Sequence, residues 1–440
     1  MDRAFNVLLI VHTAAQRAGT IREHVEALTH SSTHHVATID NATAHMVNFA
    51  AFDVIALHYS LVIASPAYIS DPLREKIARF PGLKLLFIQD EYRWIDDTAR
   101  AIHDLGISVV FSLIDPKIVR QVYHHPFLAD VRFEFTLTGF VSRQLVTRRV
   151  PDYEQRQIDV GYRARKLSAW YGYHTLQKWQ IADAFVADAR PFGLNLDIST
   201  REEDRIYGRR WVRFLADCKA TLGTESGASV LDYGDDIRRN VEAYLREHPN
   251  AGYEELSERF FGEVDGRVVM NVISPRCFEA AALRTLMVMY PGEYGGILEP
   301  GRHYLVLEPD HANLEEVVAT IRSPARARAI IERAYREIAC CDDLSFAALG
   351  RHVDRIIGER GHFVRAEART PNLIWRARLG GAAAHLLARL RITAAEYGMR
   401  LERLVLARAR SRLSDRACER LESGLQQLRR AAKRWILGVQ

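Results

Sequence analysis

The chain has 440 residues, of which 48% are hydrophobic and 26% are charged, and its formal net charge is +5. These values are typical of a soluble globular protein that is long enough for two or more domains, each with its own core. No apolar run approaches the roughly 20 residues that a membrane-spanning helix needs, which argues against an integral membrane protein. The stretch 7–11 is too short for a signal peptide, so we expect a buried first strand there.

Residues 1–150 alternate short apolar runs with segments of helical period. The strand candidates are residues 7–11, 36–39, 54–57, 85–88, 109–111 and 133–137. Helix-period stretches lie between several of them, at 20–28, 72–80 and 97–105. Strands that alternate with helices predict a parallel sheet covered on both faces, that is, an α/β domain.

A second series of strands and helices begins near residue 158, after a polar, proline-containing join at 150–156. We therefore predict a second α/β domain over 151–360, with a polar helical insertion or lid near 232–261. In such two-domain proteins, ligands bind beyond the carboxyl ends of the strands and between the domains. Functional residues are expected just after each strand.

The stretch 273–301 is the most informative part of the chain. It contains a loop, a helix start at Glu279, an apolar strand at 286–289 and a glycine-rich turn that ends at Glu299. A helix N-terminus attracts a diphosphate, and a carboxylate there accepts hydrogen bonds from ribose hydroxyls. The alternative interpretation is an ordinary helix–strand unit with an acidic first turn.

Together these segments resemble the GT-B glycosyltransferases, in the branch of the spore-maturation-type enzymes. Stretches 87–93, 137–140, 158–166, 205–211 and 222–229 also match that pattern, so the resemblance covers roughly residues 5–355. It implies two Rossmann-like domains and a hexosyltransferase that uses a nucleotide-sugar donor. Metal-free enzymes of this fold stabilise the leaving diphosphate with basic side chains, and the absence of an Asp-x-Asp motif agrees with metal independence.

The resemblance implies a set of catalytic residues. Arg163 occupies the arginine position after the first strand of the second domain, and Lys178 resembles the lysine of the next helix, with Arg165 or Lys166 as substitutes. The retaining families carry Glu-x7-Glu, of which Glu279 matches the second glutamate. Asn271 stands at the first position, so Glu225 is the expected stand-in.

Further residues are expected around the donor. Ser226 and Gly227 offer a hydroxyl and a backbone N–H near phosphate or sugar, while Ser274 and Arg276 enter the Glu279 helix. The turn residues expected to close the pocket are Gly295, Gly296 and Glu299.

In the first domain, polar side chains follow two strands. His58 ends the third strand, and Asp90 and Glu91 end the fourth beside Arg93. Each of these groups is a candidate to bind the acceptor hydroxyl or to act as its base, and a structural role is the alternative for each.

The composition changes over residues 361–440, which hold seventeen Lys and Arg against six Asp and Glu. The sequence predicts a basic helical appendage there. It is either a packed helical hairpin or an amphipathic segment on an anionic membrane surface, and no nucleic-acid motif accompanies it. The five cysteines have neither zinc nor redox spacing, so we expect the cytoplasm, with the inner membrane face as the alternative location.

The leading hypothesis is a cytoplasmic glycosyltransferase without metal or other cofactor, acting on an unknown glycan, lipid-linked or protein acceptor. A nucleotide-sugar epimerase or hydrolase and a non-catalytic scaffold are the alternatives. A Rossmann dehydrogenase is disfavoured because no G-x-G-x-x-G follows the first strand.

Overall fold

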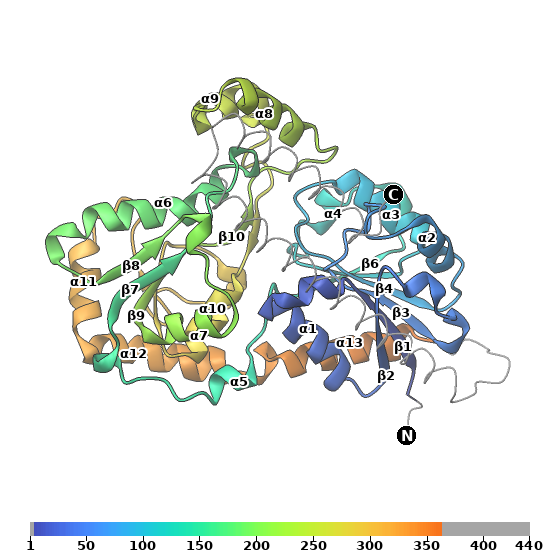
Figure 1. Ribbon diagram of the computed structural model, residues 1–440, viewed down its shortest axis with the longest axis horizontal. Coiled ribbons are helices and arrows are strands. Elements are labelled where there is room, and N and C mark those ends of the chain that lie inside the picture. The colour runs from blue at the N-terminus through green and yellow to red at the C-terminus, as the bar shows by residue number, and fades with distance from the viewer. Residues whose placement is uncertain (1–3, 363–440) are drawn as a thin grey trace, which may run out of the picture.

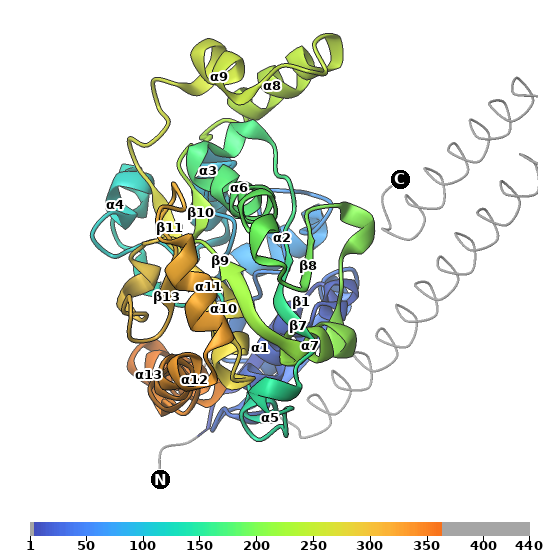
Figure 2. The same ribbon diagram turned by 90° about the vertical axis from the view of Figure 1, so that its left-hand side faces the viewer.

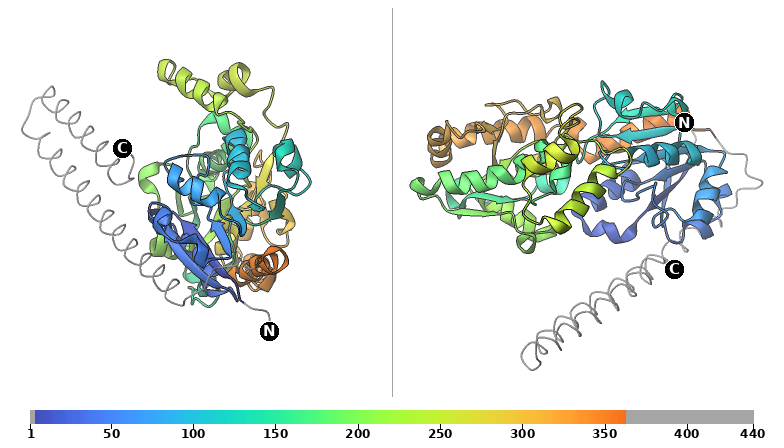
Figure 3. Two further views of the ribbon diagram at one scale, coloured as in Figure 1. Left: turned by 90° about the vertical axis from the view of Figure 1, so that its right-hand side faces the viewer. Right: turned by 90° about the horizontal axis from the view of Figure 1, so that it is seen from above.

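The computed structural model describes residues 4–362, so the predicted basic appendage lies outside the described residues from position 363 onward. Two parallel sheets, each flanked by helices, lie side by side in this part of the chain (Figure 1; Figure 3, right). This arrangement confirms the predicted α/β class with two Rossmann-like sheets. No helix in residues 4–362 is long and apolar enough to cross a membrane.

The first sheet has six parallel strands in the order β2-β1-β3-β4-β5-β6. They are β1 (Asn6–Val11), β2 (His35–Asp40), β3 (Val54–Leu57), β4 (Leu83–Phe87), β5 (Val109–Ser112) and β6 (Arg132–Phe135). The four inner strands are buried along their whole length because helices cover both faces of the sheet. Helices α2 (Asp71–Ala78) and α3 (Ile95–Leu105) pack on one face, and α1 (Gly19–His30) packs on the other. Two short helices, α4 (Val119–Val122) and α5 (Arg143–Val146), complete this half.

The second sheet has five parallel strands in the order β13-β12-β9-β7-β8. They are β7 (Ile158–Arg163), β8 (Leu196–Ser199), β9 (Cys218–Gly223), β12 (Leu286–Met289) and β13 (Leu305–Val306). Helices α7 (Gly208–Asp217) and α10 (Pro275–Ala282) pack together on one face. The other face is covered by α6 (Tyr173–Asp188), α11 (Leu314–Arg322) and α12 (Pro324–Ala334).

The last described helix, α13 (Phe346–Arg360), returns to the first sheet. Its residues Leu349, Val353 and Ile356 share a core with Val7 and Leu9 of β1. In Figure 1, α12 and α13 follow one another across the lower part of the molecule, from the second half to the first. We predicted that the second domain extends to residue 360, but the packing assigns α13 to the first sheet because its apolar face covers that sheet.

The predicted insertion projects from the body of the molecule as α8 (Asp236–Glu247) and α9 (Tyr253–Leu256) (Figure 2). The chain enters and leaves it through a short antiparallel pair, β10 (Ser226–Ala228) and β11 (Met270–Val272). Leu231 and Met270, at the base of the insertion, pack in the core of the first sheet. The insertion is therefore anchored on both halves.

Candidate functional site

A pocket of about 230 Å³ lies at the carboxyl ends of β7 and β9, beside the start of α10. This edge of a parallel sheet is where α/β proteins bind ligands. The polar residues that line it are Arg165, Lys178, Thr221, Thr224, Ser226, Ser274 and Arg276. Three of these side chains are cationic and none of the lining residues is acidic, so the pocket favours an anion.

The N-terminus of α10 forms one wall of this pocket. Ser274 is the N-cap, and its hydroxyl accepts a hydrogen bond from the backbone N–H of Arg276 at 3.4 Å. Pro275 follows at the first helical position, where a missing N–H costs no hydrogen bond. The helix dipole adds partial positive charge at the same place.

The first domain contacts the second domain beside this helix start. Thr138 donates its hydroxyl hydrogen bond to the carbonyl of Ile273. Gly139 lies so close that an added Cβ would stand 2.9 Å from Cβ of Pro275. The 137–140 segment, part of the family resemblance, therefore lies where the two domains meet.

Lys178 and Arg276 are two of the three cations that line the pocket. Arg276 donates to the carbonyl of Arg163 and lies over the rings of Tyr162 and Trp211, at 5.9 and 5.1 Å from their centroids. Lys178 has no hydrogen-bonded or ion-paired partner for its ammonium within residues 4–362. Burial, and then the charge of Arg276, lowers the pKa of Lys178 to about 8.

Glu279 lies on α10, three residues after Arg276. Its carboxylate accepts a hydrogen bond from Nε1 of Trp211 at 2.8 Å. Burial raises the pKa of Glu279, while Trp211 and the charge of Arg276 act against that rise. The predicted ribose-binding carboxylate is thus held beside the cationic pocket by a tryptophan that the sequence analysis did not single out.

Arg163, by contrast, is not among the residues that line the pocket. Its guanidinium donates to the Asp197 carboxylate at 2.6 Å and to three backbone carbonyls, those of Tyr162, Asp197 and Asp204. Four hydrogen bonds and a stacking contact on Phe214 leave it little capacity for a ligand. Its contacts are those of a structural residue that fixes the end of β7.

Glu225 also points away from the pocket, although its neighbours Thr224 and Ser226 line it. Its Oε1 accepts a hydrogen bond from the backbone N–H of Tyr294 at 2.7 Å, and burial raises its pKa. The carboxylate thereby holds the 292–294 loop. Gly295 and Gly296 form an exposed turn at φ of 66° and 70° outside the pocket lining.

Of the other residues predicted to bind the sugar donor, Arg165 lines the pocket, whereas Gly227 and Glu299 do not. Arg165 lines the pocket from its rim, and its Nε is 3.9 Å from Glu202. Gly227 lies in β10 at φ 115°, where an added Cβ would stand 1.6 Å from the carbonyl oxygen of Met270. Glu299 is exposed and paired with Arg302 at 3.8 Å, outside the pocket lining.

Asp90 is a first-domain carboxylate whose charge acts on a residue of the pocket. It follows β4 in an exposed position at φ 58°, and Oδ1 accepts a hydrogen bond from the Tyr92 hydroxyl at 2.7 Å. Its charge opposes the lowering of the Lys178 pKa by burial, and it adds to the rise that burial causes in the pKa of Tyr171; both residues belong to the second domain. Asp90 therefore lies within electrostatic range of the cationic pocket from the opposite domain.

His58 and Glu91 are buried instead. His58 Nε2 lies 3.1 Å from Nδ1 of His24, and burial lowers the pKa of His58, so the pair is neutral. Burial raises the pKa of Glu91 to about 7, and hydrogen bonds from Ser112, Tyr123 and the backbone of residue 113 hold it inside the first domain. Neither group is accessible to an acceptor.

The sequence analysis missed Trp211, Tyr92 and Tyr171, which surround these groups. The tyrosine rings lie 5.2 Å apart, one from each domain. Trp211 belongs to the 205–211 stretch of the family resemblance. Its hydrogen bond to Glu279 could not be read from the sequence, because it forms only where α7 packs against α10. Within residues 4–362 there is no cluster of three or more His, Cys, Asp or Glu that could hold a metal ion.

Comparison with known proteins finds similarity at the level of structure. No family model and no curated protein sequence matches the chain. Among solved structures, an alpha-glucosyltransferase (AGT) in complex with UDP aligns over 80% of this chain and 99% of its own, with a TM-score of 0.50 and 8% identity. T4 phage BGT with UDP-glucose aligns over 81% and 100%, with a TM-score of 0.46 and 12% identity. HepE of Anabaena in complex with UDP aligns over 81% of this chain and 100% of its own, with a TM-score of 0.44 and 12% identity. The first alignment supports the assignment of the GT-B fold.

Proposed function

We propose that the chain is a GT-B glycosyltransferase that moves a sugar from a nucleotide-sugar donor to an acceptor hydroxyl. The observation that carries this proposal is the acid-free pocket with Arg165, Lys178 and Arg276 at the start of α10. It has the charge that a nucleoside diphosphate requires, at the edge of the sheet where such ligands bind. The alpha-glucosyltransferase of the same fold is complexed with UDP, which makes UDP the first nucleotide to test.

In this proposal the pocket stabilises the leaving group. The bond between the sugar and the diphosphate breaks, and negative charge accumulates on the diphosphate. Lys178, Arg276 and the N–H groups at the start of α10 neutralise that charge without a metal ion. Glu279, oriented by Trp211, accepts hydrogen bonds from the ribose hydroxyls.

Asp90 then serves as the acceptor base. The acceptor oxygen forms the new bond to the sugar and transfers its proton to the Asp90 carboxylate. Its exposure supports this role over the other two candidates of the first domain. Asp90 is exposed, whereas Glu91 and His58 are buried and hydrogen-bonded to their own domain.

Three further proposals rest on sequence. The motif order favours the spore-maturation-type branch, and the acceptor is a glycan, lipid-linked or protein hydroxyl. The basic residues of 361–440 suit an enzyme that works in the cytoplasm at the inner membrane face.

A thermal-shift screen with UDP, ADP, GDP, CDP and TDP tests the donor site. A diphosphate present at 100 times its dissociation constant stabilises the protein by about 2.7 kcal/mol, so one of the five should raise Tm by several degrees. Lys178→Gln should weaken the binding of that diphosphate by about tenfold, because a charge-assisted contact is lost.

Lys219→Gln is the matched control. Lys219 lies at the opposite end of β9 and pairs with Asp159 at 2.8 Å, so its loss should leave affinity unchanged. No shift with any of the five diphosphates would refute the donor site. Donor turnover in water that no added hydroxyl acceptor accelerates would favour the hydrolase alternative.

A further inference from the structure

The loop that carries Asp90 has an unusual backbone. Two of its five residues, Asp90 and Trp94, have left-handed φ values of 58° and 53°. Residues with a Cβ seldom adopt this conformation, and they keep it only where surrounding contacts hold them. The contacts that hold residues 90–94 therefore decide where the proposed base lies.

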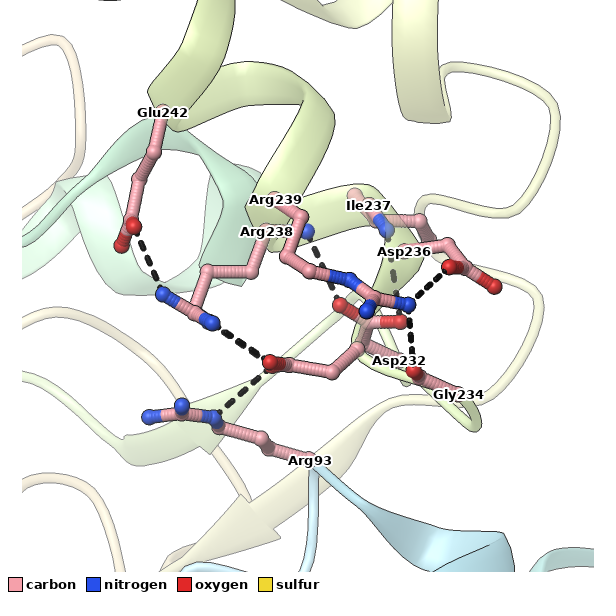
Figure 4. Close-up of polar contacts among 9 residues, drawn as sticks. Arg93, Asp232, Gly234, Asp236, Ile237, Arg238, Arg239 and Glu242 are labelled. Carbon is pink, nitrogen blue, oxygen red and sulfur yellow. Dashed lines mark hydrogen bonds and ion pairs between the residues drawn. The ribbon is translucent and has the colours of Figure 1, made fainter.

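Arg93 provides the main side-chain contact, and it reaches into the second half of the chain. Its Nε donates to Asp235 Oδ1 at 3.0 Å (Figure 4). The guanidinium also lies 3.5 Å from the ring centroid of Trp94 and 5.9 Å from that of Trp170. Asp235 is almost fully buried, so this ion pair is little exposed to solvent.

Backbone hydrogen bonds reinforce the contact on both sides of it. The N–H of Asp232 donates to the carbonyl of Tyr92 at 2.8 Å, and the N–H of Asp96 donates to the carbonyl of Tyr233 at 3.2 Å. Residues 231–235, which leave β10 of the second half, are thus docked along residues 92–96 of the first.

Asp90 itself is tied to this junction. The Tyr92 hydroxyl donates to Asp90 at 2.7 Å, and the Tyr92 ring packs edge-on against Tyr171. Tyr171 lies just before α6, the helix that carries Lys178. One connected set of contacts therefore joins the proposed base to the helix of the proposed phosphate-binding lysine.

We propose that Arg93 and Asp235 form a clasp that positions Asp90 against the donor-binding domain. Arg93 and Asp235 are positioning residues, and they act on the reaction only through the placement of the Asp90 loop. This role rests on the proposed function, in which Asp90 is the acceptor base.

The same cluster contains the controls. The Nε of Arg238 also donates to Asp235, at 2.8 Å. Arg238 lies on α8, three residues after Asp235, so this contact does not join the two halves. Arg239 pairs with Asp236 in an exposed contact within α8 (Figure 4). If the cluster only stabilised the start of α8, the Arg238→Gln change would affect exchange and turnover at least as much as the Arg93→Gln change.

The test uses the full chain with Arg93→Gln and Asp235→Asn, against Arg238→Gln and Arg239→Gln. Asparagine tolerates the left-handed φ of 66° at position 235, so this change removes the charge and keeps the backbone. Amide hydrogen exchange at Asp96 and Asp232 reports the docking, UDP affinity reports the donor site, and UDP release from UDP-glucose in water reports turnover. If the screen selects another base, its diphosphate and glucose conjugate replace these probes.

Arg93→Gln and Asp235→Asn should speed exchange at both amides about tenfold and slow turnover about tenfold, because a charge-assisted hydrogen bond is lost. UDP affinity should stay within about twofold, since no donor contact changes. The Arg239→Gln chain should behave as the wild type, and Arg238→Gln should change exchange less than Arg93→Gln.

Unchanged exchange in Arg93→Gln would overturn the clasp. Faster exchange with unchanged turnover, or UDP affinity that falls in step with turnover, would overturn its positioning role. If the wild-type chain binds no diphosphate, the proposed function fails and the positioning role fails with it. The exchange data would still decide whether Arg93 and Asp235 hold the two halves together.

Discussion

The pKa of Lys178 depends on three features of its surroundings. Burial disfavours the ammonium, the charge of Arg276 disfavours it further, and Asp90 on the other domain partly restores it. The resulting pKa of about 8 means that the group is largely protonated at neutral pH and loses its proton in mild alkali. In the proposed donor site, the protonated form is the one that holds the diphosphate.

We therefore predict that diphosphate affinity falls as pH rises through about 8. The direction of the change follows from linkage, because the ligand binds the protonated lysine more tightly. Above that pKa, binding requires uptake of a proton, which lowers the affinity. The total loss should approach the roughly tenfold weakening expected for Lys178→Gln, because a neutral lysine likewise lacks the charge. Isothermal titration from pH 6.5 to 9.5 measures the profile.

In Lys178→Gln the same profile should be flat over this range. A variant that keeps the alkaline loss would assign the titration to another group and remove Lys178 from the phosphate site.

Single residues show how far sequence reasoning reached. Ser274, Arg276 and Lys178 were predicted, and they line one pocket because a helix start and a strand end are readable from local pattern. Arg163 and Glu225 were placed by analogy of position, yet their side chains turn toward Asp197 and the 292–294 loop. Rotamer direction and packing partners decide that choice, and neither is encoded in spacing along the chain.

Among the elements, the β10–β11 pair shows what periodicity does not reveal. The long apolar strands were predicted because complete burial demands continuous apolar runs. Strands β10 and β11 have three residues each and pair across a long insertion. The close approach of Gly227 to Met270 is the feature that makes this pairing possible.

Gly227→Ala should lower the free energy of unfolding by about 2–5 kcal/mol, since it adds both backbone strain and overlap with the carbonyl of Met270. Gly296→Ala is the matched control. It has a left-handed φ of 70° but open space around an added Cβ, so it should lose only about 1–2 kcal/mol. Urea denaturation compares the two. Equal losses would mean that the close backbone approach in β10 contributes nothing beyond the φ value.

For the whole molecule, charge is distributed unevenly along the chain. Residues 361–440 have an excess of eleven positive charges, so residues 1–360 have an excess of six negative ones. The overall net charge of +5 conceals this division. An acidic body with a basic terminal segment favours attachment to an anionic surface through that segment alone.

We predict that the full chain co-sediments with anionic vesicles at low salt and dissociates as salt rises, because each Lys or Arg near the surface contributes about 1 kcal/mol. A chain that ends after His362 should remain folded, bind the same diphosphate and stay in the supernatant. Neutral vesicles provide the control. Equal binding of the shortened chain would place the attachment surface in residues 1–362, and its aggregation would instead assign residues 363–440 to packing.

The return of α13 to the first sheet has a consequence for synthesis of the chain. Strands β1 to β6 leave the ribosome early, whereas the helix that covers one face of them lies roughly 200 residues later, a delay on the order of 10–40 s at ~5–20 residues per second. During that interval the face with Val7, Leu9 and Phe87 lacks one of its two covering helices. The half of the protein that is translated first therefore keeps part of its apolar face uncovered until α13 emerges.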